Sequence, residues 1–130
     1  MNILVGYSGM GISNKALSLA REHARIFNAR VFILTSREGG SGEKLNEIEQ
    51  IEKGLDEARQ LIEEQGVSCE THQLARGMSP GEDIVKFARD NDINLIYVGI
   101  KKKSKAQKII LGSTAQYIIL KAPCPVVAVK

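Results

Sequence analysis

The chain has 130 residues, a length typical of one domain, and we expect a single domain over residues 1–130. Its 43% hydrophobic and 25% charged residues are ordinary for a globular protein, and a net charge of +3 does not indicate a nucleic-acid partner. Two cysteines and two histidines are too few for a disulfide framework or a metal site. No apolar run approaches the ~20 residues of a membrane span, and the N-terminus lacks a signal-peptide pattern. These features predict a cytoplasmic protein without a membrane partner.

The first part of the chain predicts a strand, a helix and a second strand. Residues 3–5 form a short apolar run that ends at Gly6, as is typical of a buried strand. Ser13 is a candidate N-cap for a helix that ends near Asn28, because apolar residues recur between them at helical spacing. Residues 31–34 are again wholly apolar and predict a second buried strand.

The middle of the chain predicts a loop, a long helix and a third strand. Residues 38–42 are rich in glycine and are typical of a loop. Residues 45–62 carry apolar side chains at intervals of three and four, which predicts an amphipathic helix. Gly66 follows it in a position where a left-handed residue commonly ends a helix. Residues 67–74 alternate between apolar and polar, as in a strand with one partly exposed face.

A third helix and a fourth strand follow. Ser79 is expected to cap the helix, with Pro80 at its first position and Glu82 completing a capping box. Residues 95–98 then form an apolar run that stops at Gly99. This run predicts another buried strand.

The last part of the chain begins with a basic segment over residues 101–108, which contains five lysines and is interpreted as a loop. Ser113 and Gln116 form a second capping-box pattern and predict the start of a helix. Pro123 ends that helix, and residues 126–129 predict the final strand.

The alternation of strands and helices predicts the fold class. Strands separated by helices pair in parallel through right-handed crossovers. We therefore expect a single-domain α/β fold, an open five-stranded parallel sheet with helices on both faces. This is a three-layer sandwich of the Rossmann-like or flavodoxin-like type, for which the order 2-1-3-4-5 and its close relatives are the natural candidates. In such sheets ligands bind beyond the carboxyl ends of the strands, where the strand order reverses.

Two glycine-bearing turns mark the expected pocket, because Gly6–Gly11 and Gly99–Gly112 follow the first and fourth strands. Glycine allows a close approach of the backbone to a ligand and permits a positive φ. Gly112 and Ser113 at a helix start combine free N–H groups, the helix dipole and a hydroxyl, which suit a phosphate. The alternative is a tight turn with a simple N-cap, and these residues alone favour neither. The neighbouring lysines are likewise either mobile charges for a phosphate or a solvated loop.

Catalytic residues cannot be placed from the sequence. His23 falls beside the apolar face of the first helix, and His72 is isolated in a strand, so neither has the partners of a general base. Neither phosphate-loop motif, G-x-x-x-x-G-K-[ST] or G-x-G-x-x-G, is present. Residues 8–13 are a poor match to the S-G-G-x-D-S loop of ATP pyrophosphatases. An enzymatic role would therefore extend at most to slow ATP hydrolysis.

The region from the fourth strand to the C-terminus resembles the universal stress protein family. Family members carry G-x2-G-x9-G-[ST] after the fourth strand, and here the pattern reads Gly99-x2-Lys102-x9-Gly112-Ser113. The last strand opens with P-C-P-V, as in the family. The opening I-L-V-G, the turn G-M-S-P and the strand N-L-I-Y-V-G also match. The resemblance therefore spans the whole chain.

The resemblance implies strand order 3-2-1-4-5 and a homodimer formed through the last strand. It also implies that ATP or AMP binds at the carboxyl ends of the first and fourth strands and regulates a dimer in the stress response; whether Mg²⁺ accompanies the nucleotide is left open. By position, Ser36 would present backbone groups to adenine, and the glycine motif would contact phosphates and ribose. The predicted nucleotide-binding residues are Gly6, Ser8, Gly9, Ser36, Gly99, Lys102, Gly112, Ser113 and Thr114.

Two departures from the family pattern leave an alternative open. Lys102 replaces the second motif glycine, and Ser8 stands where nucleotide-binding members commonly have an acidic residue. Either change would remove a contact with the nucleotide, although Lys102 could substitute a cation for the lost backbone contact. The alternative function is therefore a stress-response interaction protein with a vestigial pocket and no nucleotide.

Overall fold

The computed structural model describes most of the chain, with short gaps. The described residues are 1–7, 11–39, 42, 44–103 and 108–130. Within the segments 11–13 and 101–110, side chains are not described. In chain order the elements are β1 (Asn2–Gly6), α1 (Gly11–Phe27), β2 (Arg30–Arg37), α2 (Leu45–Glu63), β3 (Cys69–Ala75), α3 (Pro80–Asp90), β4 (Leu95–Gly99), β5 (Lys101–Lys103), β6 (Lys108–Ile110), α4 (Ser113–Lys121) and β7 (Val126–Val129).

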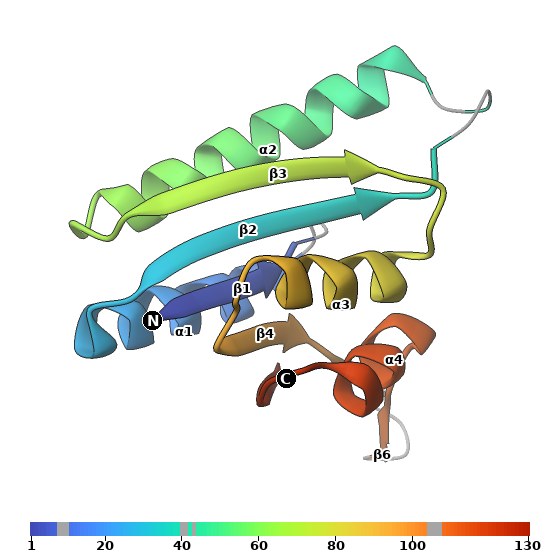
Figure 1. Cartoon of the computed structure of the whole chain (residues 1–130). Coiled ribbons are helices and arrows are strands. Elements are labelled where there is room, and N and C mark those ends of the chain that lie inside the picture. The colour runs from blue at the N-terminus through green and yellow to red at the C-terminus, as the bar shows by residue number, and fades with distance from the viewer. Residues whose placement is uncertain (8–10, 40–41, 43, 104–107) are drawn as a thin grey trace.

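The main sheet has five parallel strands in the order β3-β2-β1-β4-β7 (Figure 1). With β7 counted as the fifth strand, this is the order 3-2-1-4-5 that the family resemblance implies, and the flavodoxin-like order 2-1-3-4-5 is excluded. Strand β1 is central, because Ile3 pairs with Val31 of β2 on one side and with Leu95 of β4 on the other. The predicted α/β fold class is confirmed.

Helices cover both faces of the sheet, which gives the expected three layers. Helices α1 and α2 pack on one face, where Ile3 and Val5 join their apolar residues in one core cluster. Helices α3 and α4 pack on the other, where Leu4 belongs to a second cluster with residues such as Ile84 and Ile118. Ile3, Leu4 and Val5 have no exposed surface, as expected for a strand of a parallel sheet covered on both faces.

The helix ends follow the sequence signals only in part. Gly66 has φ of 76°, which confirms it as a left-handed residue after α2. Helix α1 ends at Phe27, next to the predicted stop at Asn28, which is also left-handed with φ of 52°. Helix α1, however, begins at Gly11, before the expected cap at Ser13. Strand β2 extends beyond the predicted end at Leu34, since its pairing with β3 continues as far as Arg37.

Neither predicted capping box forms. Ser79 occupies the N-cap position of α3, but its side chain makes no capping hydrogen bond. At α4 the N-cap is Gly112, so the helix already includes Ser113. The side-chain amide of Gln116 donates to the carbonyl of Leu111 at 3.1 Å and does not reach back to Ser113.

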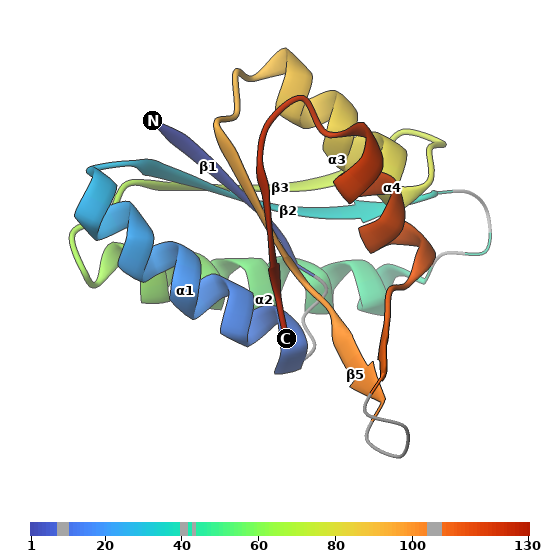
Figure 2. The same cartoon turned by 90° about the horizontal axis from the view of Figure 1, so that it is seen from below.

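The basic segment expected to be a loop contains two short strands. Strands β5 and β6 pair antiparallel, with Lys102 opposite Ile109. Figure 2 shows this ribbon continuing beyond the end of β4, away from the sheet. The prediction of a simple loop was wrong. The lysines of β5 form a strand because they pair with residues just before Gly112, and the composition of the lysine run does not indicate this pairing.

Both cysteines are free and partly buried. Burial, together with the neighbouring Glu63 carboxylate, raises the pKa of the Cys69 thiol to about 12. Burial also raises the pKa of the Cys124 thiol. Both are therefore protonated near neutral pH, which makes them poor nucleophiles.

Among the described residues, no helix combines the length and the apolar character needed to cross a membrane.

Helices α3 and α4 approach each other closely at Gly81. A β-carbon added there would lie 3.0 Å from Cβ of Tyr117 and 3.2 Å from its ring. We expect Gly81→Val to lower the free energy of unfolding by about 1–3 kcal/mol, because the added branches overpack this contact. The measurement is urea denaturation. As a control, Gly54→Ala in α2 meets only an ordinary contact at 3.8 Å and should raise stability by roughly 0.5–1 kcal/mol. Equal effects of the two changes would contradict this packing argument.

Candidate functional site

The strand order reverses at β1, and this fixes the position of a crevice. The chain runs from β1 to β2 and β3 on one side and then crosses to β4 and β7 on the other. Gly6 and Gly99 are the last residues of the neighbouring strands β1 and β4. Helix α1 follows β1 on one face, whereas α4 packs on the opposite face. The carboxyl ends of β1 and β4 therefore form the reversal point at which open α/β sheets bind ligands.

The described glycines at this point do not use the positive φ that glycine permits. Among described glycines, the positive φ values belong to Gly39, Gly66 and Gly77. Gly112 has φ of −66° and ψ of 163°, and no described atom lies within 4 Å of a β-carbon built on it. At Gly6 an added β-carbon would meet Ile84 at 3.4 Å, an ordinary contact. Gly112 therefore leaves open space beside the backbone, and that space is its contribution to a site.

Among the described residues, no side chain competes for the N-terminus of α4. Its N-cap makes no side-chain hydrogen bond, and its first turn holds no acidic residue. Ser113 is exposed and Thr114 is partly buried. The first N–H groups of a helix lack intrahelical acceptors, and the dipole places partial positive charge there. This end of α4 can accept an anion.

Three of the predicted nucleotide-binding residues are not described in full. Ser8 and Gly9 lie outside the described residues, as does the side chain of Lys102. The backbone of Lys102 lies in the middle of β5, paired with Ile109. Gly99 and Gly112 flank this ribbon, so the family spacing between them is spanned by an antiparallel pair of strands.

The backbone N–H and C=O of Ser36 face the crevice and have no backbone partner among the described residues. The carbonyl of Leu34 accepts a hydrogen bond from the N–H of Tyr7, on the β1 side of β2. Successive residues of a strand direct their backbone groups to alternate sides, so those of Ser36 also face the β1 side. Strand β1 ends at Gly6, opposite Leu34, and among the described residues no backbone group pairs with Ser36 on that side. One N–H and one C=O of Ser36 therefore point together toward the β1 side.

Side chains that the sequence analysis did not single out hold this edge in place. The hydroxyl of Thr35 donates to the carbonyl of Tyr7 at 2.6 Å, which ties the end of β2 to the residue after β1. The hydroxyl of Ser36 donates to the carboxylate of Asp83, which also accepts from Arg76. Helical spacing offered one signal, because Asp83 lies four residues before Phe87 on the apolar face of α3.

The comparisons with known proteins agree with this arrangement. The model of the universal stress protein family matches residues 1–130. The chain belongs to this family. It is 31% identical to universal stress protein MJ0531 of Methanocaldococcus jannaschii, over 98% of this chain and 81% of that protein. It is 30% identical to a universal stress protein of Thermus aquaticus, over 98% of this chain and 97% of that protein.

A solved structure of a universal stress protein from Archaeoglobus fulgidus has a TM-score of 0.91 and 36% identity, and the match covers 100% of this chain and 98% of that one. A second structure from Archaeoglobus fulgidus, described as a complex with dAMP, has a TM-score of 0.86 and 33% identity with the same coverage. The relation to the family therefore extends over the whole fold, including the carboxyl edge of the sheet.

In this fold the two histidines contact residues of the hydrophobic core. Nδ1 of His23 lies 2.5 Å from the hydroxyl of Tyr97, whose side chain is fully buried in β4. His72 packs against Phe32 and Phe87, and its buried Nε2 has no hydrogen-bond partner among the described atoms. Neither histidine lies beside a nucleophile or a carboxylate in the described contacts. The described residues also contain no group of three potential metal ligands.

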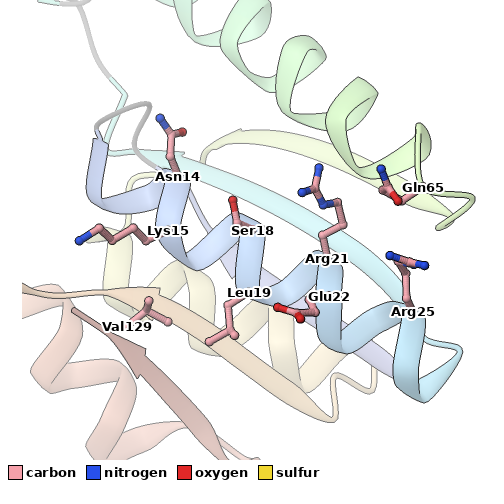
Figure 3. A pocket seen from close by; sticks show the side chains of 9 residues that line it. All are labelled: Asn14, Lys15, Ser18, Leu19, Arg21, Glu22, Arg25, Gln65 and Val129. Carbon is pink, nitrogen blue, oxygen red and sulfur yellow. The ribbon is translucent and has the colours of Figure 1, made fainter.

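A groove of about 830 Å³ lies elsewhere, along the outer side of α1 (Figure 3). Lys15, Arg21 and Arg25 project from α1 around it, with one acidic side chain, Glu22, between them. Val129 at the end of β7 borders the groove beside Leu19. None of the predicted nucleotide-binding residues that the structure describes lines it.

The hydrogen bond from Thr35 to Tyr7 provides a test of how this edge is held. Thr35 is 8% exposed, so Thr35→Val keeps the shape but leaves the carbonyl of Tyr7 without its partner. We expect the free energy of unfolding to fall by about 1–2 kcal/mol in urea denaturation. Thr71→Val on β3 removes a hydroxyl without a hydrogen bond among the described contacts, and it should be nearly neutral. A smaller loss for Thr35→Val than for Thr71→Val would contradict the anchoring role.

Proposed function

We propose that this chain is a cytoplasmic, nucleotide-binding regulatory protein of the universal stress response, which binds AMP or ATP at the carboxyl ends of β1 and β4 and acts as a homodimer. The observation that carries the proposal is the relative from Archaeoglobus fulgidus. At 33% identity and a TM-score of 0.86 over the whole chain, that protein is described in complex with dAMP. An adenine nucleotide is therefore the ligand class that best fits this family member.

The geometry of the carboxyl edge supports the base end of this proposal. The N–H and C=O that Ser36 directs toward the β1 side offer one donor and one acceptor. The edge of adenine has the complementary pair, because N1 accepts a hydrogen bond and the N6 amino group donates one. A base placed beyond Gly6 could satisfy both backbone groups at once.

The start of α4 supports the phosphate end. Gly112 leaves open space beside its backbone, and the N–H groups of the first turn face no side-chain cap. A phosphate would accept from these N–H groups and from the hydroxyl of Ser113, as at other helix N-termini that bind anions. Since the described residues contain no metal cluster, we propose that Mg²⁺ enters only with the triphosphate of ATP.

Calorimetric titration with AMP and ATP tests nucleotide binding. We expect saturable binding by the wild type and at least a ~10-fold weaker Kd for Gly112→Val, because the new side chain fills the space beside the phosphate. The variant should fold, since φ at Gly112 is −66° and the position of its β-carbon is open. Gly42→Val, at an exposed glycine with equally open surroundings, is the matched control and should bind normally.

One outcome of this titration favours the second candidate function. Lys102 occupies the position of a family motif glycine, within the paired strand β5. No heat of binding at millimolar AMP or ATP would refute the nucleotide proposal. It would instead favour a stress-response interaction protein whose pocket is vestigial.

The exposed edge of β7 supports the proposed homodimer. This strand pairs only with β4 in the described structure, so its other edge is free. The neighbouring α4 exposes Tyr117, Ile119 and Leu120, by 37%, 41% and 78%. An unpaired edge beside exposed apolar side chains is a surface on which a second copy can add a strand.

The direction of the β7 backbone allows a specific test of the dimer. The carbonyl of Pro125 accepts from Ile96 of β4, and that of Val129 accepts from Ile100, the residue after β4. The N–H of Ala128 therefore faces the free edge. Ala128→Pro removes that N–H and leaves the ladder to β4 intact. We expect a dimeric wild type and a monomeric variant by light scattering after gel filtration, with similar thermal unfolding. Ala128→Val, which keeps the N–H, should remain dimeric; a dimeric proline variant would contradict the proposed interface.

A further inference from the structure

Asp83 is the one charged side chain among the described residues that is fully buried, with 0% of its surface exposed. A carboxylate removed from water is strongly unfavourable unless it is paired and hydrogen-bonded. It lies in the first turn of α3, where the helix dipole favours negative charge. Neither the proposed contacts to phosphate nor the dimer surface involves this side chain, so its burial needs a separate explanation.

The partners of Asp83 come from two other elements. The hydroxyl of Ser36, near the end of β2, donates to Oδ2 at 2.7 Å. Nε of Arg76, just after β3, donates to Oδ1 at 2.7 Å, and Nη2 of the same guanidinium contacts that oxygen as well. Each carboxylate oxygen is therefore used. The ion pair is charge-assisted, and about a third of the Arg76 side chain is exposed.

This cluster fixes the residue whose backbone faces the crevice. The side chain of Ser36 is held on the α3 side by Asp83, while its N–H and C=O, unpaired within the described part of the chain, point along the sheet toward the β1 side. Strand β1 no longer pairs with β2 beyond Leu34. Among the described residues, the hydroxyl of Thr35 ties this strand end to Tyr7, and the Asp83 cluster adds a second constraint that acts on Ser36 itself.

We infer that Asp83, with Arg76, is a positioning residue that holds the backbone of Ser36 for selective recognition of adenine over guanine. This inference rests on the proposed nucleotide binding. Guanine reverses the pattern of adenine, because its O6 accepts and its N1–H donates. With the phosphate anchored at α4, a rigid N–H and C=O pair matches one pattern, and a strand end free to tilt could match both. Preorganised polar groups are the general source of such selectivity.

Calorimetry with three probes distinguishes a role of Asp83 in positioning the base from a general role in supporting the fold. The probes are AMP, GMP and inorganic tripolyphosphate, of which the last reports on the phosphate end alone. For Asp83→Asn, which keeps the shape but removes the charge, we expect AMP binding to weaken by ~10-fold or more and the AMP to GMP preference to fall. Tripolyphosphate binding should not change. Asp90→Asn is the matched control, because it removes an exposed carboxylate from the same helix and should leave all three affinities unchanged.

Two further variants keep the inference testable if Asp83→Asn fails to fold. Ser36→Ala removes the hydroxyl and leaves the ion pair of Asp83 with Arg76, so it should lose the AMP to GMP preference in the same way. Ser36→Thr keeps a hydroxyl and should restore that preference. Rescue by Ser36→Thr supports positioning through the hydrogen bond to Asp83.

The possible failures are distinguishable. A wild type that binds none of the three probes overturns the proposed function and this inference with it. A wild type that binds AMP, while Asp83→Asn and Ser36→Ala keep the same affinity and the same preference over GMP, overturns this inference alone. Equal weakening of AMP and tripolyphosphate also overturns it, because the cluster would then support the fold in general.

Discussion

Burial of β1 on both faces, combined with pairing along both edges, is the constraint on which the rest of the fold depends. Ile3, Leu4 and Val5 are fully buried, and β2 and β4 flank the strand. Such a strand must be apolar throughout, and it requires helices on both faces of the sheet. Because the chain extends from β1 first to one side and then to the other, a crevice at its carboxyl end follows from the packing alone.

Strands and helices that are marked by the spacing of their own apolar residues could be predicted from the sequence. Buried strands and amphipathic helices depend on the spacing of apolar residues, so the five-stranded α/β sheet was predictable. The strand order came only from the family resemblance. Local detail was less predictable: the capping box at Ser113 failed because the hydrogen bond of Gln116 goes to Leu111. The ribbon after β4 was missed because Lys101–Lys103 has no strand-like composition and depends on its partner strand.

The candidate site was predictable where it depends on glycine and topology, and less so where it depends on contacts distant in sequence. Gly112 stands out in the sequence by its spacing from Gly99, and it is also open in the structure. The contact between Asp83 and Ser36 joins residues of different elements, and no local pattern marks such a pair. The useful groups of Ser36 belong to the backbone, whose orientation is known only once the register of β2 against β1 is known.

The central pairing of β1 with β4 also has a consequence for synthesis of the chain. Ile3 and Leu95 are neighbours in the sheet although they are made at very different times. On the ribosome, β1 can pair with β2 early, but its other edge has no partner until β4 emerges. Until then the nascent sheet ends in an apolar strand with unpaired backbone groups, a form open to pairing with other chains. The strand that organises the finished protein is thus also the part that most needs protection while the protein is being made.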